Sequence, residues 1–150
     1  MKGLILTIRI LAVRLAFGIA RHLPLRSRVV LATAHSAKLA GNLVSIRDDL
    51  ARRHPTVPVV VLAHRPAISL RDRIAALGQA LIAGYYLATS RVFIVDDYFF
   101  PIYVIRPRDG TTIIQTWHAC GAFKKVGYSL VGKSFGADEE LTQRVRIHSN

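Results

Sequence analysis

The run 115–128 of this chain combines a histidine, a glycine-flanked turn and two lysines directly after a β-branched stretch. His118 is suited to act as a general base, because a neutral imidazole with an ordinary pKa of about 6.5 accepts protons near neutral pH. Trp117 could wall a pocket beside it, and Lys124 and Lys125 could neutralise phosphate oxygens as point charges. The run therefore predicts a site where a base meets a phosphorylated ligand.

These residues also have ordinary structural interpretations. A histidine that follows a strand more often supports the fold than performs catalysis, and two lysines at a turn are often only solvated. For His118, the adjacent tryptophan and the two following lysines favour catalysis. For Lys124 and Lys125, phosphate binding and simple solvation both remain open.

Three further polar pairs follow apolar runs that have the length and composition of strands: 35–36, 64–65 and 96–97. Because the carboxyl ends of parallel strands meet at one edge of a sheet, these pairs should converge with His118. Asp97 could hold a metal or orient a hydroxyl, or it could simply cap the strand end. Successive strand residues point to opposite faces, so only one aspartate of the pair joins a given site. His35 could bind a substrate hydroxyl, or it could be an ordinary polar loop residue.

The elements that must position these residues alternate between strand and helix. We predict strands at 28–34, 57–63, 91–95 and 111–116, with helices at 43–53 and 69–87. This alternation, in units of about 30 residues, predicts an α/β fold: a Rossmann-like parallel sheet with helices on both faces. Asn42 and Ser69 are the predicted N-caps, and segment 98–105, which contains a proline, is expected to be a loop or an edge strand. In the second helix, the expected buried residues are Ile74, Leu77, Leu81 and Ile82.

Composition favours anionic partners. The 150 residues could form one domain, and 21 Lys and Arg against 9 Asp and Glu give a formal charge of +12. No nucleic-acid-binding signature is present, so nucleic acid is the least supported partner. The single Cys120 rules out an intrachain disulfide. Neither a metal-ligand spacing nor a nucleotide-binding glycine loop occurs, so we expect no metal and no cofactor.

Residues 1–23 are rich in aliphatic side chains, but Arg9 and Arg14 interrupt them. An arginine at the centre of a spanning helix costs about 2.5–3.5 kcal/mol on insertion scales, and it also breaks the apolar core of a secretory signal. We therefore expect a membrane-surface helix whose arginines reach lipid phosphates. The alternatives are a helix packed on the domain and a true membrane span.

The string from Trp117 through Lys125, together with segments 87–101 and 41–42, resembles the CDP-glycerol glycerophosphotransferases of wall teichoic acid synthesis. The resemblance covers about residues 28–150. It implies the N-terminal half of a GT-B-type transferase, which passes glycerol phosphate from CDP-glycerol to an acceptor hydroxyl and releases CMP. The acceptor would be a polyprenyl-linked glycan or a polyol-phosphate chain at the cytoplasmic face of the cell membrane. At Ala119, the residue after His118, the sequence resembles the primase branch of this family, because polymerising members tend to have glycine there.

The resemblance also assigns roles to residues. His118 matches the histidine proposed to deprotonate the acceptor, and Asn42 joins Trp117, Lys124, Lys125, Asp97 and His35 as substrate-binding candidates. Residues 24–150 would form an acceptor domain, with the donor domain absent, so we expect the isolated chain to be inactive. Two other functions remain open: a non-catalytic, membrane-peripheral α/β module that binds anionic lipid or a partner protein, and a nucleotide-sugar glycosyltransferase of GT-B type.

Overall fold

Four parallel strands form the centre of the structure. The computed structural model describes residues 2–65, 70–96 and 98–116. The strands are β1 (Arg26–Thr33), β2 (Val59–Ala63), β3 (Ser90–Val95) and β4 (Thr112–Gln115). Their order in the sheet is β2-β1-β3-β4, and every neighbouring pair is parallel. The predicted α/β fold with a parallel sheet is confirmed.

The central strand β1 explains why the sheet is parallel and covered on both faces. Its last six residues are buried, as expected for a strand with helices above and below. In register, Val30 lies between Val60 of β2 and Phe93 of β3. Because crossovers between parallel strands are right-handed, neighbours on opposite sides of β1 require connecting helices on opposite faces.

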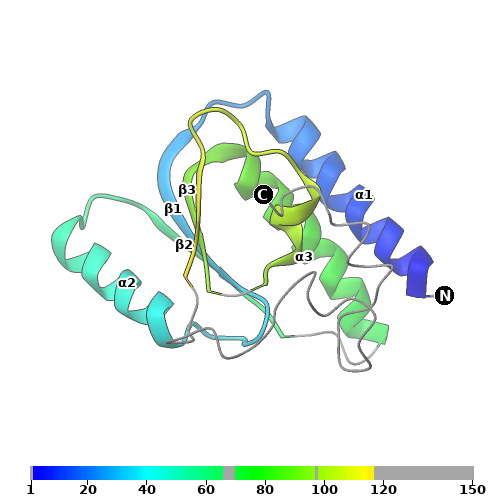
Figure 1. Ribbon diagram of the computed structural model, residues 1–150, viewed down its shortest axis with the longest axis horizontal. Coiled ribbons are helices and arrows are strands. Elements are labelled where there is room, and N and C mark those ends of the chain that lie inside the picture. Colours follow the sequence, from blue (N-terminus) through cyan, green and yellow to red (C-terminus); the bar gives the residue numbers. More distant parts are fainter. Residues whose placement is uncertain (1, 66–69, 97, 117–150) are drawn as a thin grey trace, which may run out of the picture.

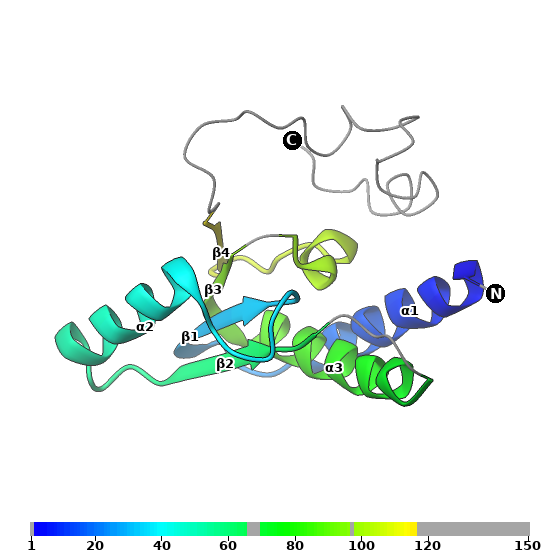
Figure 2. The ribbon, with the colours of Figure 1, turned by 90° about the horizontal axis from the view of Figure 1, so that it is seen from below.

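The helices follow this rule, as Figures 1 and 2 show. Helix α2 (Gly41–Arg53) covers one face, where Leu43 packs against Leu31 and Ile94. Helices α1 (Lys2–Ala20) and α3 (Leu70–Thr89) lie side by side on the other face. The larger of the two hydrophobic cores lies between these two helices and the sheet.

Helix α1 makes a close backbone contact with α3 at Gly84. A Cβ atom added at Gly84 would lie 2.5 Å from the Val13 carbonyl oxygen and 3.0 Å from the Ala16 Cβ. Both Val13 and Phe17 of α1 are buried in the core beneath this contact. The missing side chain of Gly84 therefore allows α1 to settle on the sheet. One side of this N-terminal helix therefore packs on the domain.

Three local predictions were wrong. Ile74, Leu81 and Ile82 are 66%, 42% and 49% exposed, because α3 turns a different face, which carries Ala80, Ala83 and Leu87, toward the core. Segment 98–105 is neither loop nor edge strand; it contains the 3₁₀ helix η1 (Phe100–Val104), whose start suits a proline because the first amides of a helix need no partner. Asn42 is not the N-cap of α2. That position is Ala40, without a side-chain cap, while the predicted cap Ser69 lies outside the described residues.

The contact at Gly84 gives a stability test with a matched control in the same helix. Gly84→Ala should lower the free energy of unfolding by about 1–3 kcal/mol, because the new methyl meets rigid backbone. Gly78→Ala should instead raise it by about 0.5–1 kcal/mol, because nothing lies near that position and alanine favours a helix. Urea unfolding of the full-length protein measures both. Equal effects of the two substitutions would contradict the close packing of α1 on α3.

Candidate functional site

The carboxyl ends of the four strands meet at one edge of the sheet. His64, Asp96 and Thr116 directly follow β2, β3 and β4, and His35 lies two residues after β1. The His64 amide donates to the Thr33 carbonyl at 3.2 Å, and the Thr116 amide donates to the Val95 carbonyl at 2.8 Å. These two hydrogen bonds continue the pairing between neighbouring strands by one residue and fix the positions of His64 and Thr116 at this edge. Strand order reverses between β1 and β3, which is where open α/β sheets bind ligands.

Helix α1 brings Arg9 into a cluster of aromatic rings. The Arg9 guanidinium carbon lies 4.9 Å from the centre of the Phe100 ring, close enough for a cation–π contact. Burial lowers the pKa of Arg9, while nearby Tyr98 acts in the opposite direction. The rings of Tyr98 and Tyr103 stack with centroids 4.9 Å apart. Burial, followed by the neighbouring Tyr103, raises the pKa of Tyr98 to about 12, so this tyrosine is neutral at physiological pH.

His64 lies at this edge in surroundings that change its pKa. Its ring is half-buried and lies 5.8 Å from the Phe99 ring. Burial lowers the pKa of His64, and the positive charge of Arg9 lowers it further. Both effects favour the neutral imidazole, which can accept a proton or a hydrogen bond at neutral pH.

Three polar atoms of the described residues are buried without a hydrogen-bond partner, and all are on residues at or near this edge. They are Arg9 Nε, Asp96 Oδ1 and Gln115 Nε2. Tyr103 donates to the other polar atom of the Gln115 amide, its Oε1, at 3.3 Å. A buried polar atom without a hydrogen-bond partner costs about 1–3 kcal/mol. Such atoms therefore commonly mark a place where water or a ligand binds. Two of the three atoms are donors, Arg9 Nε and Gln115 Nε2, and the third is a carboxylate acceptor.

The structure describes only some of the predicted site residues. His35 is exposed at the edge, and its amide donates to Thr33 Oγ1 at 3.4 Å. Asn42 is exposed in the first turn of α2. The other candidates lie outside the described residues: Asp97, Trp117, His118, Lys124 and Lys125.

Sequence reasoning missed part of this edge. Arg9 was expected to reach lipid, yet it lies one helical turn before the buried Val13 and points into the aromatic cluster. That spacing was the available signal, because residues four apart share a helix face. Tyr103 and Gln115 carried no comparable signal, since only tertiary packing brings them together.

The comparisons with known proteins fit this architecture. Residues 15–150 match the family described as CDP-glycerol:poly(glycerophosphate) glycerophosphotransferase. The chain belongs to this family. Among its relatives are the teichoic acid ribitol-phosphate primase of Bacillus spizizenii, 40% identical over 82% of this chain and 31% of that protein, and the poly(ribitol-phosphate) polymerase of the same organism, 31% identical over 78% and 18%. The teichoic acid glycerol-phosphate primase of Bacillus subtilis is 33% identical over 67% of this chain and 24% of that protein.

The chain thus spans about a third or less of the length of these relatives. None of the helices described in the structure has the length and apolar character needed to cross a membrane.

The surroundings of His64 predict a measurable titration. Its imidazole should titrate below the ordinary value of 6.5, and Arg9→Met should move the pKa back only partly, because burial is the larger cause. The folded state then binds fewer protons than the unfolded state. Stability that depends on neutral His64 is fully present above pH 6.5 and is lost as pH falls through the lower, folded-state pKa. NMR titration of the ring protons measures both variants; a wild-type pKa at or above 6.5 would contradict this geometry.

Proposed function

We propose that this chain is the acceptor-side part of a phosphotransferase of teichoic acid synthesis. The observation that carries the proposal is the family match, which runs without interruption through residues 15–150. The parallel sheet supports it, because its carboxyl edge gathers polar groups that remain without partners. The whole protein would transfer a polyol phosphate from a CDP-polyol to a hydroxyl of a polyprenyl-linked glycan or polyol-phosphate acceptor.

In this reaction His118 acts as the general base. It takes the proton of the acceptor hydroxyl as the oxygen attacks the phosphorus that bears the polyol. The new phosphorus–oxygen bond forms while the bond to the bridging oxygen of the diphosphate breaks, and CMP leaves with that oxygen. A base of this kind contributes about 10²–10⁴-fold to the rate. Lys124 and Lys125 would balance charge on the phosphate oxygens, and Trp117 would wall the site.

The edge described above supplies the acceptor side. The Asp96 carboxylate could accept a hydrogen bond from an acceptor hydroxyl, and Arg9 Nε could donate to an oxygen of the same molecule. Asp97, His35 and Asn42 remain substrate-binding predictions from the sequence. We propose CDP-glycerol as the donor, which agrees with the family description. CDP-ribitol is the alternative raised by the name of the Bacillus spizizenii primase.

We also propose that the protein works at the cytoplasmic face of the membrane as a peripheral protein. The side of α1 opposite the core carries five large aliphatic residues, 42–67% exposed and spaced three or four apart: Leu4, Ile8, Leu11, Leu15 and Ile19. We call this set the α1 stripe. An exposed apolar stripe on a basic helix is typical of helices that lie in the membrane interface, where a lipid-linked acceptor would be presented.

His118→Ala in the full-length protein should lower kcat for CMP release by about 10²–10⁴-fold, because the acceptor hydroxyl loses its base. His54→Ala is the control, since His54 is exposed at the end of α2 and lies before β2 begins. The assay compares CDP-glycerol and CDP-ribitol with the same lipid-linked acceptor. Unchanged turnover in His118→Ala with both donors would refute the proposed role of His118. Turnover of the wild-type protein with CDP-ribitol alone would show that the donor is CDP-ribitol and not CDP-glycerol.

A further inference from the structure

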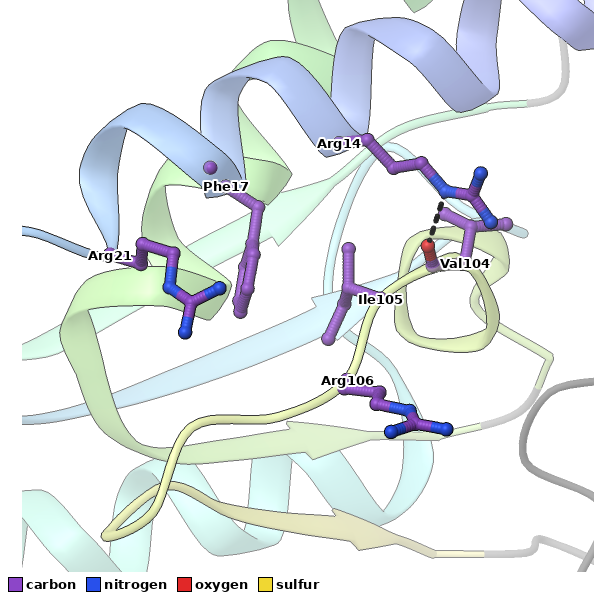
Figure 3. A pocket seen from close by; sticks show the side chains of 7 residues that line it. Arg14, Phe17, Arg21, Val104, Ile105 and Arg106 are labelled. Atoms are coloured by element: carbon purple, nitrogen blue, oxygen red, sulfur yellow. Dashed lines mark hydrogen bonds between the residues drawn. The ribbon is translucent and has the colours of Figure 1, made fainter.

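A pocket on the side of α1 gathers three arginines around an apolar floor. Its volume is about 430 Å³, and Figure 3 shows Arg14 and Arg21 extending from α1 and Arg106 from the segment after η1. Phe17 and Ile105 form the floor and are buried, whereas the three arginines are exposed. Gly18 and Val104 complete the lining. The pocket therefore offers three guanidinium groups around an apolar surface.

No carboxylate among the described residues pairs with these arginines. Helix α2, by contrast, pairs its arginines with its own carboxylates: Arg47–Asp48, Arg52–Asp49 and Arg53–Asp49. Arg14 donates its Nε to the Val104 carbonyl at 3.0 Å, a bond that orients the guanidinium without using its two terminal nitrogens. Three cations around one pocket repel each other, so an anion bound there would relieve that repulsion.

The pocket opens beside the α1 stripe. Successive residues of a helix rotate by about 100°, since a turn takes about 3.6 residues. On this basis Gly18 lies between the stripe residues Leu15 and Ile19 on one side and Arg14 and Arg21 on the other. A surface that meets the stripe would therefore also reach the arginines. Arg9 and Arg14 are five residues apart, which turns their side chains away from each other by about 140° around the helix, so the pocket and the aromatic cluster of Arg9 lie on different sides of α1.

We propose that this pocket binds the phosphate group of an anionic membrane phospholipid while the α1 stripe enters the acyl boundary. A helix in the interface buries its apolar face by about 5–10 Å, which places flanking arginines at the depth of the lipid phosphates. Guanidinium groups bind phosphate with paired hydrogen bonds. The inference rests on the membrane placement proposed above, but it does not depend on the transfer chemistry.

Two triple variants of the full-length protein with the same change in net charge provide the test. The pocket variant carries Arg14→Gln, Arg21→Gln and Arg106→Gln. The control variant carries Arg47→Gln, Arg52→Gln and Arg53→Gln on α2, which covers the opposite face of the sheet. Cosedimentation uses phosphatidylcholine vesicles with and without phosphatidylglycerol, and it needs neither donor nor acceptor.

The pocket variant should bind phosphatidylglycerol vesicles on the order of 100-fold more weakly than wild type, since each interfacial arginine contributes about 5-fold. The control variant should change by about 2-fold or less. Equal losses in both variants would show charge attraction without a site, and unchanged binding in the pocket variant would also overturn the proposal. Full competition by inorganic phosphate at constant ionic strength would show a site for free anions instead.

Because Arg14 also bonds to Val104, the double variant Arg21→Gln with Arg106→Gln is measured as well. It should lose about 25-fold in binding while its thermal unfolding stays that of wild type. A double variant that stays folded and binds like wild type would refute the site. Because the vesicle assay contains no substrate, a negative result would refute the lipid site without bearing on the role of His118 in the transfer reaction.

Discussion

The close contact between α1 and α3 at Gly84 determines how α1 is placed on the sheet, and the other features of the structure depend on that placement. Because Gly84 has no side chain, the backbone of α1 at Val13 can approach α3 and settle over the sheet. That contact fixes the rotation of α1 about its own axis. Val13 and Phe17 enter the core, Arg9 reaches the carboxyl edge of the strands, and the α1 stripe faces outward. One packing constraint thus connects the core, the polar edge and the proposed lipid surface.

Much of this architecture could be predicted because the strands have a local signal. The runs 28–34, 57–63, 91–95 and 111–116 are short, β-branched and bounded by turn residues, and each differs from the observed strand by at most two residues at either end. Alternation with helices then favours parallel pairing, because a helix between two strands supplies the long crossover that parallel strands need. The edge at which polar residues gather follows from that pairing without knowledge of any ligand.

The remaining features depend on tertiary contacts that local patterns do not encode. In α3, apolar residues recur at helical spacing on more than one face. Only the packing of α1 selects the face with Ala80, Ala83 and Leu87 as the buried one. Arg9 was assigned to lipid because an arginine in an apolar helix usually reaches water or phosphate. Instead it is held over Phe100, which is 91 residues later in the chain. The pairing of Tyr103 with Gln115 likewise arises only when η1 and β4 pack together.

On the proposed membrane surface, the two sides of α1 would face different environments: the packed core on one side and lipid on the other. Spin labels placed singly at Leu11 and Ile19 of the α1 stripe, and at exposed Ala51 of α2 as a reference, measure this directly by their accessibility to oxygen and to a polar relaxation agent on phosphatidylglycerol vesicles. If α1 lies in the membrane interface as proposed, the two α1 labels lie below the phosphate level while the α2 label stays in water. Labels on α1 that remain as accessible to the polar agent as the label on α2 would contradict it.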